Sequence, residues 1–111
     1  GVERMLALRA SGNDVQFKVT RGVTRPVWEP DGRTMALYDH ARGLARSLGY
    51  DISSQSSGGG SDGNFTGAMG IATLDGLGVA GANAHTLDEH IMVDSLAYRG
   101  KLMAGLLATL E

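Results

Sequence analysis

The sequence predicts an α/β fold, and two observations carry that prediction. From residue 31 onward the predicted elements follow the order helix, strand, helix, strand, helix, an order in which helices pack in layers on a sheet. The composition, with 42% hydrophobic and 20% charged residues, is that of a globular domain, and 111 residues suffice to bury a core.

Residues 1–22 predict one helix and one strand that belong to a preceding unit. Apolar residues at helical spacing begin the chain, and the cluster Ser11-Gly12-Asn13-Asp14 predicts a turn. Val15, Phe17 and Val19 then alternate with polar residues, which is the period of a half-buried strand. Neither element can bury its apolar side without partners from elsewhere.

A proline-rich stretch predicts a crossing between two domains, and a long helix follows it. Arg25-Pro26 and Pro30-Asp31-Gly32 disfavour both helix and strand. The spacing then predicts a helix over 33–48, with Gly49 at the left-handed position that ends it. The apolar face of this helix comprises Met35, Tyr38, Ala41, Leu44, Ala45 and Leu48.

The next segment predicts two short strands and a short helix. Residues 50–55 are compatible with a strand, and residues 58–62 form a sharp loop. Ser61 or Asp62 can cap a short helix that runs to about Met69. Residues 71–74 predict a buried strand, and residues 76–84 a loop.

The chain ends on a predicted amphipathic helix. Asp94 stands where a residue that caps the helix is expected. The predicted apolar stripe comprises Leu96, Met103, Leu106, Leu107 and Leu110.

Charge and composition exclude several classes of function. The net charge of −2 gives no footprint for nucleic acid. Because there is no cysteine, a metal would have to be held by histidine and carboxylates. No apolar run reaches the roughly 18 residues of a membrane span, and no signal-peptide pattern is present. The first residue is Gly1, within a helical pattern, so we expect that a start and any signal region lie upstream; a cytoplasmic location is favoured.

The first candidate site is the glycine-rich segment Ser57-Gly58-Gly59-Gly60-Ser61-Asp62-Gly63-Asn64. Consecutive glycines let a backbone approach a ligand closely. The run does not fit a nucleotide P-loop, since no lysine follows it. The competing interpretation is a tight turn with no ligand, and composition favours the two about equally.

The second candidate site is the loop around His85. Histidine is the commonest metal ligand, and Asp88 or Glu89 could orient its second ring nitrogen. On the residues alone, a surface loop histidine is the favoured interpretation. His40 and His90 are not expected to bind metal.

The third candidate is the pair Arg21 and Arg25, beside the predicted domain crossing. A guanidinium can bind a substrate carboxylate through two hydrogen bonds. Taken alone, an ordinary surface cation is again the favoured interpretation.

Together and in order, these segments resemble one superfamily, the zinc-dependent glutamate carboxypeptidases, aminoacylases and succinyl-diaminopimelate desuccinylases. The motifs are Val19-Thr20-Arg21-Gly22 with Arg25-Pro26, then the run Gly58–Asp62, then Leu74-Asp75-Gly76-Leu77-Gly78, and finally His85-Thr86-Leu87-Asp88-Glu89. The chain is most similar to the glutamate carboxypeptidase branch, in its C-terminal third.

The resemblance implies a two-domain metallopeptidase. Residues 1–24 would be the last helix and strand of an inserted lid or dimerisation domain, which makes a homodimer possible. Residues 25–111 would be the C-terminal part of a layered α/β catalytic domain. The family cleaves an amide or peptide bond next to a carboxylate-bearing residue. Its partners are therefore a small-molecule or peptide substrate with a free carboxylate, and neither nucleic acid nor membrane.

The resemblance also assigns site residues. His85 matches a metal ligand, with two zinc ions expected in the complete enzyme. Arg25 matches the arginine that binds the substrate carboxylate, with Arg21 as the alternative, and Gly60 matches a loop backbone that helps hold it. The bridging aspartate, the other metal ligands and the general-base glutamate lie in the family's N-terminal half. No catalytic residue is therefore expected here, and the chain alone is expected to be inactive.

Two other functions stay open on the sequence. One is a non-catalytic α/β module that keeps the fold and binds a ligand without the metal site. The other is an anion- or phosphate-binding domain in which residues 58–61 form the whole site.

Overall fold

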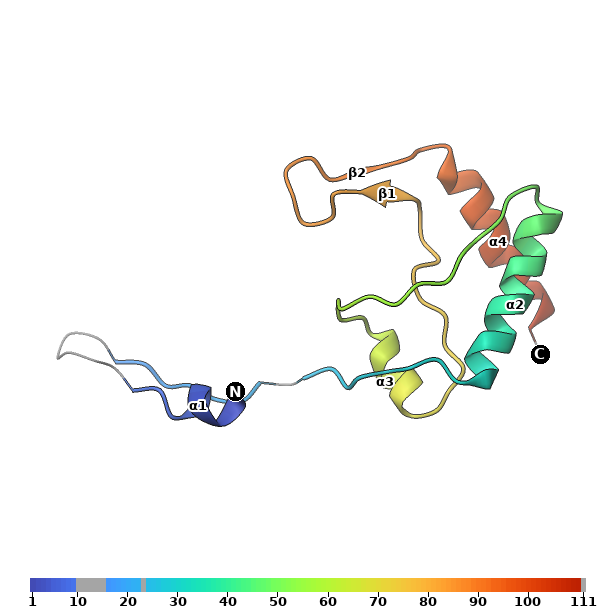
Figure 1. Cartoon of the computed structure of the whole chain (residues 1–111). Helices are drawn as coiled ribbons and strands as arrows, with labels where there is room; N and C mark the ends of the chain where they lie inside the picture. Colours follow the sequence, from blue (N-terminus) through green and yellow to red (C-terminus); the bar gives the residue numbers. More distant parts are fainter. Residues whose placement is uncertain (10–15, 23, 111) are drawn as a thin grey trace.

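The computed structural model describes residues 1–9, 16–22 and 24–110. In that part the regular secondary structure is mostly helical, with one two-stranded hairpin (Figure 1). The elements are α1 (Val2–Leu6), α2 (Gly32–Ser47), α3 (Gly63–Ala68), β1 (Gly81–Ala82), β2 (His90–Ile91) and α4 (Ser95–Thr109).

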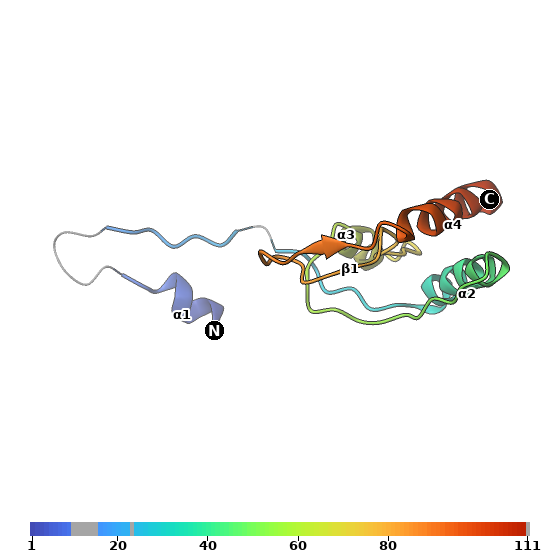
Figure 2. The ribbon, with the colours of Figure 1, turned by 90° about the horizontal axis from the view of Figure 1, so that it is seen from above.

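The segment that contains α1 stands apart from the remaining elements in both ribbon views (Figures 1 and 2). The predicted first helix is present, and it ends at Leu6. The strand predicted over 15–19 is wrong for residues 16–19, which form no strand, while Val15 lies outside the described residues. A strand needs a neighbour for its backbone hydrogen bonds, and within the described chain no strand pairs with residues 16–19. Phe17 is 47% exposed.

Helix α2 confirms the predicted long helix, and both of its ends have a local cause. Asp31 caps its start, since a side-chain oxygen of Asp31 accepts a hydrogen bond from the Thr34 amide at 2.8 Å. At its end Gly49 has φ of +89°, as predicted. The amide of Tyr50 then donates to the Ala45 carbonyl at 3.2 Å, and the Gly49 amide to that of Arg46 at 3.0 Å. These two bonds form a Schellman motif.

The core lies where α2 packs against α4 (Figure 1). Ala41 and Ala45 of α2 and Leu102 and Leu106 of α4 are the buried hydrophobic residues among those described. The alanines allow the helices to approach closely, and the leucines fill the space between them. Tyr50, Ile52, Leu74 and Leu77 pack around this core from the loops.

The predicted apolar stripe of α4 is wrong for most of its members. Leu106 is buried, but Leu96 is 50% and Leu107 is 76% exposed, and Met103 and Leu110 are exposed as well. Ser95, Leu102 and Leu106 share the face that is buried. Helix α4 is apolar on more than one face, so its periodicity alone does not identify the face that packs on α2.

Asp94 occupies the predicted cap position of α4, but its side chain makes no capping hydrogen bond. The neighbouring Ser95 holds the helix start instead. Its hydroxyl donates to the Met92 carbonyl at 2.6 Å and accepts from the Ala80 amide at 2.9 Å. Ser95 is 1% exposed, so both hydrogen bonds are buried, and the hydroxyl is satisfied both as a donor and as an acceptor.

The two short strands predicted over 50–55 and 71–74 are wrong, since neither segment is a strand in the structure. The strands that the described residues do form are β1 and β2, an antiparallel pair in which Gly81 faces Ile91 and Ala82 faces His90. Strand β1 falls inside the predicted loop 76–84. An apolar pattern predicts that a segment can be buried. A strand also requires a neighbouring segment that pairs with it in register.

None of the helices in the described residues is both long and apolar enough to cross a membrane.

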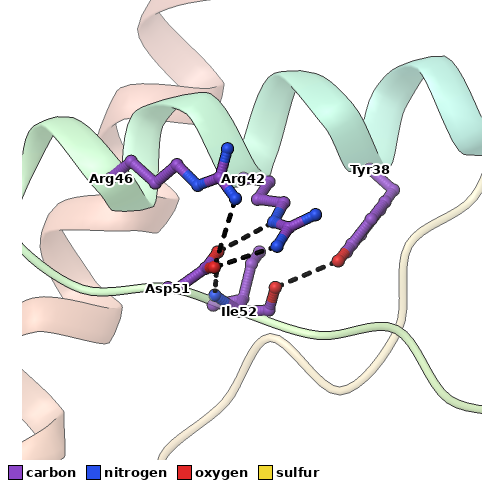
Figure 3. A network of polar contacts seen from close by, with 5 residues as sticks. All are labelled: Tyr38, Arg42, Arg46, Asp51 and Ile52. Carbon is purple, nitrogen blue, oxygen red and sulfur yellow. Dashed lines mark hydrogen bonds and ion pairs between the residues drawn. The ribbon is translucent and has the colours of Figure 1, made fainter.

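A polar network attaches the loop after α2 to the helix itself (Figure 3). Arg42 donates two hydrogen bonds to the carboxylate of Asp51, at 2.8 and 2.9 Å, and Arg46 adds a third at 3.3 Å. Tyr38 donates from its hydroxyl to the Ile52 carbonyl at 3.0 Å. The hydrogen bond from Arg42, followed by that from Arg46, holds the pKa of Asp51 well below its ordinary value of 3.8.

We therefore predict that Asp51→Asn lowers the melting temperature at pH 7. A carboxyl whose folded pKa is depressed stabilises the fold above its unfolded pKa and loses that effect as the pH falls through the folded value. The difference between variant and wild type should thus be full at neutral pH and shrink below about pH 4. Asp39→Asn, an exposed carboxylate on the same helix, is the control. A difference in melting temperature that stays constant down to pH 2 would contradict the role assigned to the Asp51 charge.

Candidate functional site

The candidate site begins with the segment 25–28, which runs along α3 (Figure 1). Two contacts attach it there. Asn64 donates from its side-chain amide to the Pro26 carbonyl at 2.9 Å. The ring of Trp28 lies against the α3 backbone at Gly67, so closely that a Cβ at Gly67 would overlap it. The position of Arg25 is therefore set by the residues that follow it.

The glycine-rich loop is closed by its own side chains. The Ser61 hydroxyl accepts a hydrogen bond from the Gly63 amide at 2.9 Å, which confirms the predicted capping and assigns it to Ser61. The Asn64 side chain reaches back and accepts from the Ser61 amide at 2.8 Å. The bond from Asn64 is one half of a capping box, with asparagine in the place of the usual glutamate, while the Ser61 hydroxyl accepts from the amide of Gly63 rather than from that of Asn64. The side chain of Asp62 makes no capping bond.

Arg25 and Gly60, which the family resemblance assigns to substrate binding, lie in contact. The stem of the arginine passes over the glycine, so a Cβ at Gly60 would lie 3.0 Å from Cδ of Arg25. The guanidinium extends to Asp62, where Nη2–H donates to Oδ1 at 3.1 Å. This ion pair is open to solvent, since the side chain of Arg25 is 50% and that of Asp62 93% exposed.

A second carboxylate lies near the same loop. The Ser61 hydroxyl, followed by the Gly76 amide, lowers the pKa of Asp75 below its ordinary value. The Gly76 amide donates to Asp75 at 2.8 Å, in a turn where Gly76 has φ of +69°. Asp75 therefore carries its charge at neutral pH. Asp75 belongs to the motif Leu74–Gly78, but its proximity to Ser61 of the glycine-rich loop was not predicted.

His85 lies on the loop between β1 and β2, in a strained backbone conformation. It has φ of +67°, and Asn83 has φ of +60°. Such values are uncommon outside glycine, although asparagine and histidine adopt them more readily than most residues. The backbone amide of His85 donates to a side-chain oxygen of Glu89 at 3.2 Å. Glu89 thus fixes the loop rather than the ring, while Asp88 offers its backbone oxygen to Nδ1 of His90 at 2.8 Å.

A zinc site needs three or four ligands from the protein. In the stretches 1–9, 16–22 and 24–110, no three histidine or acidic residues come together in a way that could hold a metal. His85 can supply one imidazole from an exposed loop. The residues described here therefore do not fit a complete metal centre.

The predicted site residues fall in two places. Arg25 and Gly60 meet beside α3, whereas His85 lies on the hairpin, which occupies the upper part of Figure 1. Sequence reasoning missed the roles of Asp62, Asn64 and Trp28. The spacing of Ser61 and Asn64 is the one available signal, since it is that of a capping box.

Comparison with known proteins places the chain in a family. The model of the peptidase family M20/M25/M40 matches residues 8–109, which is most of the chain. Neither the curated proteins nor the solved structures gave a significant match. Family membership implies part of an α/β catalytic domain, although the described residues are mainly helical. The chain belongs to the peptidase family M20/M25/M40, a family of metal-dependent hydrolases.

Proposed function

We propose that this chain is the C-terminal part of a glutamate carboxypeptidase-like zinc hydrolase, which cleaves an amide bond next to a carboxylate-bearing residue. In this proposal residues 1–24 end a lid or dimerisation domain, and residues 25–111 belong to the catalytic domain. The parent works on a small molecule or peptide with a free carboxylate. The contribution of this chain is recognition of that carboxylate, together with one metal ligand, His85.

The contact between Arg25 and Gly60 is the observation that carries the proposal. The two residues are 35 positions apart in the sequence, and each was singled out for the same role. They meet because Asn64 and α3 fix the segment that follows Arg25. A random pair of an exposed arginine and a loop glycine has no reason to lie together.

The geometry gives each residue a definite part in binding. Arg25 uses one N–H of its guanidinium on Asp62, and a guanidinium has five. The remaining donors can form the paired hydrogen bonds that match a carboxylate. Gly60 keeps the space beside the arginine stem open, since any side chain there would crowd Cδ.

Arg25→Ala tests the proposal. The variant is made in a full-length protein in which this chain follows an N-terminal half that carries the family's other metal ligands. Removing a charge-assisted contact of about 1.5–3 kcal/mol should lower kcat/KM by at least about tenfold. The loss should largely disappear for a substrate whose terminal carboxylate is amidated. The steady-state rates of wild type and Arg25→Ala on the acid and on the amide provide the measurement.

Arg21→Ala is the matched control, because Arg21 is an exposed arginine at the same predicted crossing. It should leave kcat/KM within about twofold, as surface substitutions usually do. An equal loss on the acid and the amide would assign Arg25 to structure. A loss confined to Arg21→Ala would transfer the carboxylate-binding role to Arg21.

A further inference from the structure

Asp62 forms an ion pair with the guanidinium of Arg25. We propose that Asp62 is a positioning residue that holds the guanidinium of Arg25 in the orientation that binds a carboxylate. The inference rests on the proposed function, and it assigns a role to a residue that the sequence indicated only as a helix cap.

The first step is that the side chain of Asp62 is not used by the helix. Aspartate at this position normally accepts a hydrogen bond from the first turn. Here the Ser61 hydroxyl accepts from the Gly63 amide at 2.9 Å, and Asp62 makes no capping bond. The carboxylate of Asp62 is instead bonded to Arg25, 37 residues away in the sequence.

The second step is that the arginine is held at three points. Its neighbour Pro26 is bonded through the backbone to Asn64 at 2.9 Å. Its stem lies on Gly60. Its tip is bonded to Asp62 at 3.1 Å. Without the third contact, a long side chain that is 50% exposed keeps the rotamer freedom of its outer bonds.

The third step concerns which donors remain available. The bond to Asp62 uses Nη2 alone, so the pair is not bidentate. Within the described residues no acceptor is bonded to Nε or Nη1 of Arg25. Asp62 thus orients the guanidinium and leaves its other N–H donors free, whereas a carboxylate bound through two hydrogen bonds would have occupied one whole edge of the guanidinium.

The test is binding of N-acetyl-L-glutamate to the 111-residue chain, measured by titration of the Arg25 side-chain signals in the NMR spectrum. Asp62→Ala should weaken binding by about two- to fivefold, the range of an exposed ion pair. Asp62→Asn retains an oxygen acceptor for Nη2, so it should bind at least as tightly as wild type. Asp94→Ala is the matched control, since Asp94 also precedes a helix without capping it.

A second measurement separates this inference from the proposed function. Relaxation of the Arg25 Nε–H group, without any ligand, should report greater motion in Asp62→Ala than in wild type or Asp62→Asn. If wild type fails to bind the acid, the proposed function fails, and the relaxation result alone decides the role of Asp62. Equal or tighter binding by Asp62→Ala, or unchanged motion of Arg25, would overturn the inference.

Discussion

Gly67→Ala is expected to destabilise the chain and to displace its only tryptophan. A Cβ at Gly67 would overlap Cγ, Cδ1 and Nε1 of the Trp28 ring. The same ring lies 3.6 Å from a Cβ built at Gly63, one helical turn earlier, so it has little room to slide along α3. Overpacking of this kind costs about 1–3 kcal/mol.

Gly67→Ala is informative because the expected change in stability is opposite in sign to that of an ordinary glycine-to-alanine substitution in a helix. Within a helix, alanine ordinarily stabilises by about 0.5–1 kcal/mol relative to glycine. Gly43→Ala should show that gain, since Gly43 lies in α2 with nothing within 4 Å of its Cβ position. Trp28 fluorescence and the melting temperature of both variants provide the measurement. A stabilised Gly67→Ala with unchanged tryptophan emission would show that the ring does not pack on α3.

Displacing Trp28 should also change the position of Arg25 in the candidate site. The ring and the Asn64–Pro26 hydrogen bond together hold the segment that begins at Arg25. With the ring displaced, the Asn64–Pro26 hydrogen bond and the ion pair with Asp62 remain, but the segment between Arg25 and α2 loses its packing on α3. Gly67→Ala should therefore weaken carboxylate binding as well as stability.

His85→Ala is expected to have the largest effect on activity. In a protein that joins this chain to the other metal ligands, it should lower the zinc bound per chain and reduce hydrolysis by at least about a hundredfold, since even indirect partners of metal ligands cost 10–100-fold. A surface histidine would instead give a change within about 0.5 kcal/mol. Zinc content and the rate of hydrolysis, measured on the same preparation, distinguish the two.

Two further variants distinguish the loss of the imidazole from a change in the backbone conformation at residue 85. His85 has φ of +67°, a conformation that glycine adopts without steric cost. His85→Gly should therefore lose zinc as His85→Ala does, while keeping the loop. His90→Ala, which removes a neighbouring ring that is bonded to Asp88, should keep both zinc and activity. Normal zinc content in His85→Gly would exclude His85 as a ligand.

Local signals in the sequence were sufficient where a feature depends on neighbouring residues. The span of α2 and the left-handed Gly49 were predicted, because each depends on contacts within about five residues, whereas the cap by Asp31 is a finding of the structure. The start of α3 at the glycine-rich loop was predictable for the same reason. Family membership was also accessible, since the order and separation of the motifs are properties of the sequence.

Strands were not predictable in this way. Residues 71–74 have the apolar character of a buried strand, yet they form none, because a ladder requires a second segment alongside. The choice of the buried face of α4 is similar. Leu102 and Leu106 face α2 while Leu96 and Leu107 stay exposed, and nothing in their residue types distinguishes them.

The residue pattern alone identified the family, the long helix with its C-terminal glycine, and the three segments that carry the candidate residues. Only the tertiary structure brought Arg25 over Gly60, turned Asp62 from the helix toward the arginine, and seated Trp28 on Gly67. The physical reason is the range of the interactions. Caps and turns form between near neighbours, whereas these contacts join residues 35 or more positions apart and exist only when the segment 25–28 packs on α3.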